Sequence, residues 1–233
     1  MIELVAFDGD DTLWQNESIF SMTHERFATL MSRYVDVDHI EPRLFATEMR
    51  NLHLFGYGVK SFTLSMIETA IELSDGAVTA ADIQSIIDAG RAMLEHPVEL
   101  LDGAGDAIEA VSRTHRVMLV TKGDLFDQES KLARSGLGDR FSAVEIVAEK
   151  NERAYERILT RHGVAPSQFV MIGNSPRSDI APVLAIGGWA IHVPHELTWA
   201  HERLDDEDAL AAHGRYRRAA SLADVPALLA DVA

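Results

Sequence analysis

Residues 5–14 read VAFDGDDTLW, and this stretch decides how the rest of the chain is interpreted. Apolar residues run up to position 7 and are followed at once by Asp8, Asp10 and Asp11. A short apolar run of this kind is typical of a buried strand. In an open α/β sheet, residues that follow the carboxyl end of a strand face the crevice where ligands bind. The stretch therefore predicts a cluster of carboxylates at one edge of a sheet.

The spacing of the first two carboxylates indicates chemistry. Asp8 and Asp10 are two residues apart, so in an extended backbone both side chains point to the same side. One carboxylate can then attack a substrate while the other transfers protons. Like charges this close raise one another's pKa unless a cation lies among them. Because the chain has no cysteine and oxygen ligands suit Mg²⁺, we expect Mg²⁺ as the cofactor.

Further apolar runs alternate with segments of helical periodicity along much of the chain. This alternation predicts an α/β fold, a Rossmann-like three-layer core with a mainly parallel sheet. The expected strands are residues 2–7, 116–121, 143–147, 169–173 and 189–193, with a weaker one at 215–219. The expected helices of the core are residues 103–113, 125–135, 151–162, 177–186 and 222–229.

Residues 16–95 interrupt this alternation and contain no convincing strand. Their periodicity predicts helices over residues 18–34, 41–54, 61–73 and 80–94. Thr79 with Asp82 resembles a capping box at the start of the last of these helices. An all-helical stretch of this length is too long for a simple crossover. We therefore expect an inserted all-α cap domain at 16–95 and a core made of 1–15 and 96–233.

The overall composition excludes several classes of protein. The 233 residues include 21 Lys and Arg against 37 Asp and Glu, and the resulting charge of −16 argues against a nucleic-acid partner. The absence of cysteine excludes disulfides and thiol catalysis. No apolar run approaches the ~18 residues that a membrane helix needs. The chain opens on the first expected strand without a basic leader, so we expect no signal peptide and a cytoplasmic protein.

Four segments together resemble the haloacid dehalogenase-like (HAD) superfamily. The first is DxDxT after an apolar strand, beginning at Asp8. The second is the strand RVMLVTKGD, which supplies Thr121, and the third is VEIVAEKN, which supplies Lys150. The fourth is GNSPRSDI, which has Asn174 where the family often has an acid and then Asp179. The matches occur in the family's order and span most of the chain.

The resemblance implies a Mg²⁺-dependent phosphatase that hydrolyses a small phosphorylated metabolite. In that mechanism Asp8 is the nucleophile that becomes an aspartyl-phosphate, and Asp10 is the general acid and base. Thr121 and Lys150 would hold the phosphoryl group and neutralise its charge. The implied metal ligands are Asp8, Asp10, Asn174 and Asp179. The helical insert occupies the place of the family's C1-type cap.

Several other residues carry expectations about their surroundings. The family more often has Gly at the position of Asp11, and we expect Asp11 to be an exposed turn residue. Lys122 is expected to be exposed at the start of a helix. Trp14 either lines the entrance to the site or packs at the hinge between the core and the expected insert. Between the second and third helices of the insert, Tyr57 could stack on a substrate ring and Lys60 could meet an anion, or both could belong to an ordinary turn.

Alternative functions remain open at this point. A 2-haloacid dehalogenase would use Asp8 on carbon without a metal, and the family's dehalogenases lack an aspartate at the position of Asp10. A phosphonatase would need a cap lysine that forms a Schiff base, for which Lys60 is a candidate. A phosphomutase would share the core, and a phospho-accepting signalling module would stop at the phosphoaspartate. Sugar phosphates and nucleoside monophosphates are both reasonable substrates.

Overall fold

The computed structural model describes residues 1–204 and 207–232, and the chain divides into two compact units. The α/β unit consists of Met1–Glu17, Val98–Lys122 and Gln128–Ala233. The helical unit consists of Ser18–Pro97 and the short segment Gly123–Asp127. Its main segment is shifted by two residues at each end from the insert expected at 16–95. The short segment was not anticipated from the sequence.

In the described part of the chain, six parallel strands form one sheet in the order β3-β2-β1-β4-β5-β6. They are β1 (Leu4–Phe7), β2 (Arg116–Lys122), β3 (Ala143–Val147), β4 (Phe169–Gly173), β5 (Trp189–His192) and β6 (Tyr216–Arg218). The predicted α/β class and parallel sheet are confirmed. The strand order reverses between β1 and β4, so these two neighbours form the switch point at which such sheets bind ligands.

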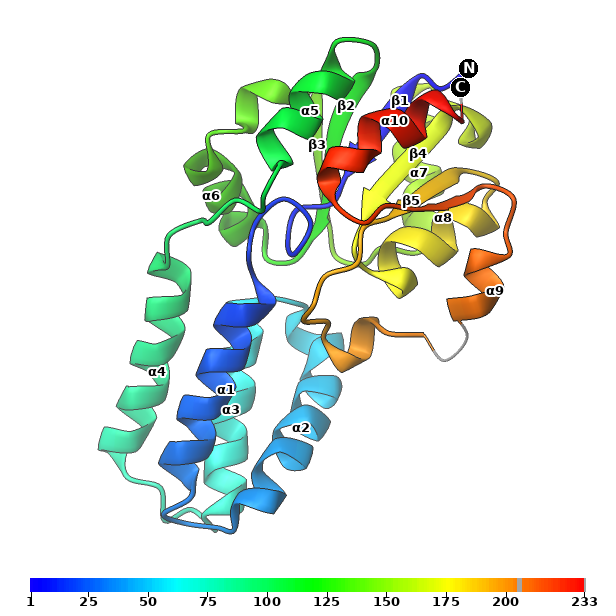
Figure 1. Cartoon of the computed structure of the whole chain (residues 1–233). Helices are drawn as coiled ribbons and strands as arrows, with labels where there is room; N and C mark the ends of the chain where they lie inside the picture. Colours follow the sequence, from blue (N-terminus) through cyan, green and yellow to red (C-terminus); the bar gives the residue numbers. More distant parts are fainter. Residues whose placement is uncertain (205–206, 233) are drawn as a thin grey trace. The chain divides into compact units, whose positions relative to one another are not determined.

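Helices cover both faces of this sheet, as Figure 1 shows. They are α5 (Ala104–Ser112), α6 (Leu125–Ser135), α7 (Glu152–His162), α8 (Ala181–Ala185), α9 (Glu207–Ala211) and α10 (Val225–Ala230). Alternate residues of β1 face opposite ways, because side chains alternate along a strand. Val5 and Phe7 pack in a core with α5 and α10. Leu4 and Ala6 pack in a second core with α7 and α8.

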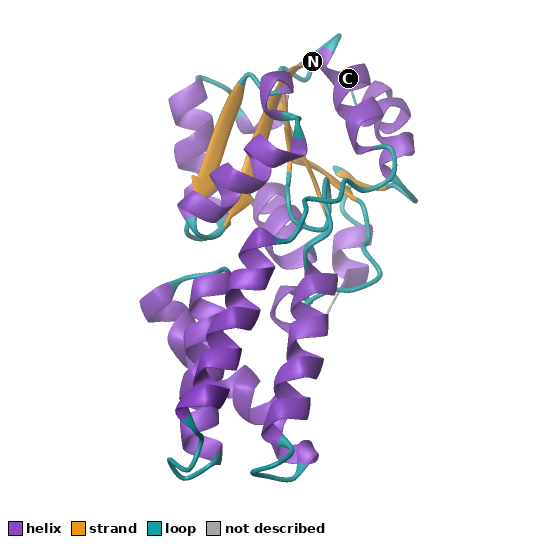
Figure 2. Ribbon diagram, turned by 90° about the vertical axis from the view of Figure 1, so that its left-hand side faces the viewer, coloured by secondary structure: helices purple, strands orange, loops and turns teal. Residues whose placement is uncertain are grey.

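The helical unit has a hydrophobic core of its own. Residues 18–97, all of which the structure describes, form helices joined by short loops (Figure 2). The helices are α1 (Glu17–Met31), α2 (Ile40–Phe55), α3 (Val59–Leu73) and α4 (Ala80–Glu95). Phe27, Leu44 and Phe62 are among the buried side chains. The predicted cap of α4 is confirmed, because Thr79 Oγ1 accepts a hydrogen bond from the N–H of Asp82.

The helix expected at residues 177–186 is wrong in form. A π-helical turn, Pro176–Ile180, comes first, and the short helix α8 follows it. Pro182 explains the break, because it has no N–H to donate to the carbonyl of Ser178, as a continuous α-helix would require. That carbonyl instead accepts a hydrogen bond from the hydroxyl of Tyr155 at 3.0 Å. The π-helical turn therefore gives residues 176–180 a backbone path that α-helical periodicity does not predict.

In the part of the chain that the structure describes, no helix is both long and apolar enough to cross a membrane.

Candidate active site

The chain leaves β1 in a tight turn that depends on Gly9 and Trp14. The N–H of Leu13 donates to the carbonyl of Gly9 at 2.7 Å, and the N–H of Asp11 donates to the carbonyl of Trp14 at 2.7 Å. A Cβ on Gly9 would lie 2.6 Å from the Trp14 ring, so a larger residue there would displace the indole. Trp14 is fully buried. It corresponds to the packing alternative, because no part of its ring faces solvent.

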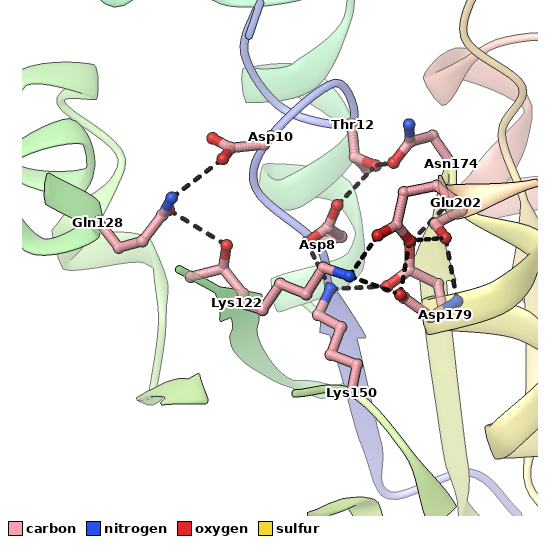
Figure 3. A network of polar contacts seen from close by, with 12 residues as sticks. Asp8, Asp10, Thr12, Lys122, Gln128, Lys150, Asn174, Asp179 and Glu202 are labelled. Atoms are coloured by element: carbon pink, nitrogen blue, oxygen red, sulfur yellow. Dashed lines mark hydrogen bonds and ion pairs between the residues drawn. The ribbon is translucent and has the colours of Figure 1, made fainter. Parts of the chain in front are cut away.

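Asp8 lies directly after β1 and forms the centre of a buried charge cluster. The ammonium group of Lys150 donates to Asp8 Oδ1 at 2.5 Å and to Asp179 Oδ1 at 2.6 Å (Figure 3). Burial and the negative charge of Asp179 raise the pKa of Asp8 to about 7, although Lys150 opposes the shift. Burial alone would lower the pKa of Lys150, but the two carboxylates outweigh it and hold that pKa above its usual range. Lys150 therefore forms ion pairs with both carboxylates.

Asp179 is held from a second side by the backbone after β4. The N–H of Ser175 donates to Asp179 Oδ2 at 3.0 Å, while Lys150 takes Oδ1. A Cβ on Gly173 would come within 2.3 Å of the Asp179 side chain, so glycine is needed for this close approach. Both oxygens of Asp179 are thus engaged by protein donors. Asp179 orients the ammonium group of Lys150. Its role as a metal ligand stays a prediction.

Two side-chain oxygens converge on the hydroxyl of Thr12. Thr12 Oγ1 lies 3.4 Å from Asp8 Oδ2 and 3.3 Å from Asn174 Oδ1. A hydroxyl has one hydrogen and can donate it to only one of these acceptors at a time. Among the described residues, no group of three or more His, Cys, Asp or Glu side chains is placed to hold a metal. One carboxylate and one amide oxygen nevertheless suit Mg²⁺, which keeps several waters and substrate oxygens as ligands.

Asp10 points to a separate set of donors. Its carboxylate accepts hydrogen bonds from Trp14 Nε1 at 2.6 Å and Gln128 Nε2 at 2.9 Å. Lys131 Nζ lies 3.0 and 3.1 Å from its two oxygens. Gln128 also accepts a hydrogen bond from the hydroxyl of Thr121 at 3.1 Å. It therefore links Thr121, the residue of the second motif, to Asp10. The carboxylate is therefore fixed by three side chains.

Sequence reasoning missed Gln128 and Lys131, which lie three residues apart on α6. This spacing places both on one face of the helix, and α6 directly follows the strand that carries Thr121. That combination was a usable signal, because a helix leaving the carboxyl end of a strand begins beside the site. A lysine and an amide on its inner face are natural partners for a carboxylate of the first loop.

The expectation that Asp11 is exposed is wrong. Asp11 is 7% exposed, and its Oδ1 accepts hydrogen bonds from the N–H groups of Asn16 and Glu17 at 2.9 and 3.0 Å. Its φ of 56° lies in the left-handed region, which favours glycine and, among other residues, Asn and Asp. Burial raises the pKa of Asp11 to about 6, against the effect of the Glu17 N–H. Asp11 thus satisfies the backbone at the start of α1 while accepting an uncommon φ.

The expectation for Lys122 is also wrong. Its side chain is only 15% exposed, because it lies in an ion pair with Glu202. It also donates to Ser178 Oγ at 2.9 Å. The sequence pattern did not reveal this burial, because Glu202 is 80 residues away along the chain.

Tyr57 and Lys60 belong to the helical unit. Lys60 Nζ forms an ion pair with Asp124 at 2.9 Å, and its side chain is 55% exposed. The predicted roles of Tyr57 and Lys60 in substrate binding stay predictions.

The fold and the cluster define a class of enzyme. A carboxylate at the switch point of a parallel sheet, paired with a buried lysine and followed two residues later by a second fixed carboxylate, is suited to nucleophilic hydrolysis. The family model for haloacid dehalogenase-like hydrolases matches residues 2–187. The chain therefore belongs to this hydrolase family, and the resemblance inferred from its four motifs is confirmed.

One solved structure gives the same family assignment, and two more distant ones share the fold. A haloacid dehalogenase-like family hydrolase from Xanthomonas campestris is 44% identical, with a TM-score of 0.89 over 99% of this chain and 91% of that one. The 2-haloacid dehalogenase of Pseudomonas syringae pv. Tomato DC3000 is 22% identical over the whole of both chains, with a TM-score of 0.64. The HAD-hydrolase YfnB of Bacillus subtilis, solved with magnesium, is 15% identical over 98% and 99% of the two chains, with a TM-score of 0.68. No match was found among curated proteins.

Proposed function

We propose that this protein is a Mg²⁺-dependent phosphatase that hydrolyses a small phosphomonoester through an aspartyl-phosphate on Asp8. The observation that carries the proposal is the fixed carboxylate of Asp10, held by Trp14, Gln128 and Lys131. The alkoxide that leaves a phosphomonoester needs a proton, whereas a leaving halide does not. A second carboxylate in the nucleophile's own turn is therefore useful for phosphate ester chemistry.

In the first step, a carboxylate oxygen of Asp8 attacks phosphorus and the bond to the leaving oxygen breaks. Asp10, which must enter this step protonated, gives its proton to that oxygen, and the product alcohol departs. In the second step, Asp10 takes a proton from a water molecule, which attacks the phosphorus and releases inorganic phosphate from Asp8. Lys150 and the hydroxyl of Thr121 are buried donors suited to the charge on the phosphoryl oxygens.

Asp8 and Asn174, whose side-chain oxygens lie near the hydroxyl of Thr12, are the residues that would hold Mg²⁺. When bound, the ion would supply positive charge that keeps Asp8 ionised and offsets the charge of the phosphate. The pKa of Asp8, raised to about 7 by burial and by Asp179, supports a cation at this position. Asn174 is a neutral ligand, so we expect weaker metal binding than a carboxylate would give.

The helical unit is proposed to act as the family's C1-type cap. It is inserted between β1 and α5, directly after the turn that carries Asp8 and Asp10. An insert at this point of the chain can shelter a covalent intermediate from bulk water and select the leaving group. Tyr57 and Lys60 are the side chains proposed for contact with a ring and with an anionic group of the substrate.

The test measures phosphate release from a panel of phosphorylated metabolites, with Mg²⁺ and with a chelator. We expect release that depends on Mg²⁺ and that Asp8→Asn abolishes. Asp10→Asn should lower turnover by ~10²–10⁴-fold, the usual worth of general acid–base catalysis. Asp88→Asn serves as the control, because that side chain is 58% exposed. Equal rates with chelator, or full activity in Asp8→Asn, would exclude the mechanism.

One observation favours metal-free 2-haloacid dehalogenation as a second candidate. Asp8 and Asp179 share Lys150 as their cation, and Asn174 adds no negative charge near them. In that reaction Asp8 would attack carbon, displace a halide and form an ester that water then hydrolyses. Chloride release from 2-chloropropionate in the presence of chelator, without phosphate release from the panel, would establish this candidate instead.

A further inference from the structure

Glu202 enters the site from a part of the chain that carries none of the motifs. It ends a 3₁₀ helix, Ala200–Glu202, beyond the residues matched by the family model. Its side chain is 12% exposed, and its carboxylate accepts three hydrogen bonds (Figure 3). Ser175 Oγ donates to Oε2 at 2.5 Å and Ser178 Oγ donates to the same oxygen at 2.6 Å. Lys122 forms an ion pair with the other oxygen, Oε1.

The directions of these hydrogen bonds are fixed by their neighbours. Ser178 Oγ accepts from Lys122 Nζ at 2.9 Å, and Ser175 Oγ accepts from the N–H of Ser178 at 3.0 Å. Each hydroxyl therefore turns its single hydrogen toward Glu202. The partner at this point must accept at both oxygens, which an ionised carboxylate does and an amide does not. Lys122 and the serine hydroxyls accordingly lower the pKa of Glu202 to about 2, although its burial acts in the opposite direction.

Each of the three donors is the immediate neighbour of a residue of the candidate site. Lys122 follows Thr121 at the end of β2. Ser175 follows Asn174, and Ser178 precedes Asp179, which orients Lys150. Glu202 thus connects the end of β2 to the turn after β4. A displacement of this carboxylate would move the backbone on both sides of Asp8.

We propose that Glu202 is a positioning residue. It holds Thr121, Asn174 and Asp179 at the positions around Asp8 that turnover requires. This inference rests on the proposed function, because its main test measures turnover of a phosphate ester. Glu202 touches no reacting atom and acts through Lys122 and the two serines. The 3₁₀ helix that carries it is itself held in place, because Arg177 Nη1 donates to the carbonyl of His201 at 3.1 Å.

The test compares Glu202→Gln with Glu196→Gln, using p-nitrophenyl phosphate and saturating Mg²⁺. Glu196 is exposed in the same segment, so its variant makes the same change of charge without touching the site. We expect Glu202→Gln to lower kcat by ~10–100-fold, as loss of an outer partner of a metal site does, with KM changed less than about threefold. Glu202→Asp keeps the charge and should restore part of kcat. Equal kcat in Glu202→Gln and Glu196→Gln would overturn the proposal.

A second variant covers the case in which Glu202→Gln does not fold. Ser178→Ala removes one hydroxyl and leaves both Glu202 and Lys122 in place, and it should lower kcat in the same direction by a smaller factor. Unchanged kcat in Ser178→Ala would count against the proposal. A merely structural role would lower the melting temperature of Glu202→Gln and Glu202→Asp alike without a selective loss of kcat, and that result would also overturn it.

Amide hydrogen exchange separates failure of this inference from failure of the proposed function. Glu202→Gln should speed exchange in residues 174–180, and Glu196→Gln should not. If the wild type releases chloride from 2-chloropropionate but no phosphate, the phosphatase proposal fails and the variants are compared on chloride release. If neither substrate reacts, exchange decides alone, and unchanged exchange in Glu202→Gln overturns the positioning role.

Discussion

Replacing Asp8 by Asn should stabilise the metal-free protein at pH 8 while it abolishes turnover. Asp8 is 6% exposed and shares the single charge of Lys150 with Asp179. Its ionised form is therefore less favourable in the folded chain than in the unfolded chain, where water surrounds it. Asparagine has nearly the same shape, carries no charge and leaves Lys150 paired with Asp179.

The raised pKa sets the size and sign of the effect. Raising the pKa of Asp8 from 3.8 to about 7 corresponds to destabilising the ionised form by about 4 kcal/mol at most. Between these pH values the folded chain holds a proton on Asp8 that the unfolded chain has lost. The free energy of unfolding of the wild type should therefore fall as pH rises from about 4 to about 7. Asp8→Asn lacks this contribution, so its advantage should reach ~2–4 kcal/mol at pH 8 and disappear near pH 4.

The assay is urea unfolding in chelator at pH 4, 6 and 8, with Asp88→Asn as a control. The control side chain is 58% exposed, so its variant should stay within about 0.5 kcal/mol of the wild type at each pH. Added Mg²⁺ should stabilise the wild type more than Asp8→Asn, since binding to the folded state adds to stability. The reasoning fails if Asp8→Asn is less stable than the wild type at pH 8, or if the two show the same dependence on pH.

Three further predictions test neighbouring parts of the site. Because Asp11 has a φ of 56°, Asp11→Ala should be less stable than Asp11→Gly by about 1 kcal/mol in urea unfolding, and equal stability would contradict strain at this turn. Lys131→Met removes the ion pair with Asp10 and should lower kcat by ~10-fold or more, measured at saturating substrate. Asn174→Asp adds a carboxylate beside Asp8 and should reduce the Mg²⁺ concentration for half-maximal turnover, so an unchanged or higher value would argue against a metal at this position.

The sheet could be predicted from the sequence because its central strands β1, β2 and β4 are mostly buried. Parallel strands with helices on both faces read as short apolar runs, and β3 and β4 begin and end at the residues expected. The form of residues 176–185 could not be predicted by the same rule. Their apolar positions fit helical periodicity, whereas Pro182 and the hydroxyl of Tyr155 act through backbone hydrogen bonds that periodicity does not record.

The contacts of the candidate site also include some that could be predicted from the sequence and some that could not. Asp8, Thr121, Lys150 and Asn174 each lie at or just after the carboxyl end of a strand, and parallel strands bring those ends together. Their convergence follows from topology, so motif order was enough to predict it. Glu202 reaches the site from a segment that follows β5, where no periodic pattern constrains the path. The burial of Lys122 depends on that segment and was therefore missed.

The charge balance of the cluster links stability to the choice between the two candidate reactions. Two carboxylates share one lysine, so one negative charge near Asp8 lacks a protein cation within this trio. With its pKa raised to about 7, Asp8 is partly protonated at neutral pH in the metal-free protein and is then a poor nucleophile. A cation between Asp8 and Asn174 would restore the ionised form. The metal-free dehalogenation candidate, in contrast, requires turnover in chelator to rise as pH increases through about 7, which the phosphatase proposal does not.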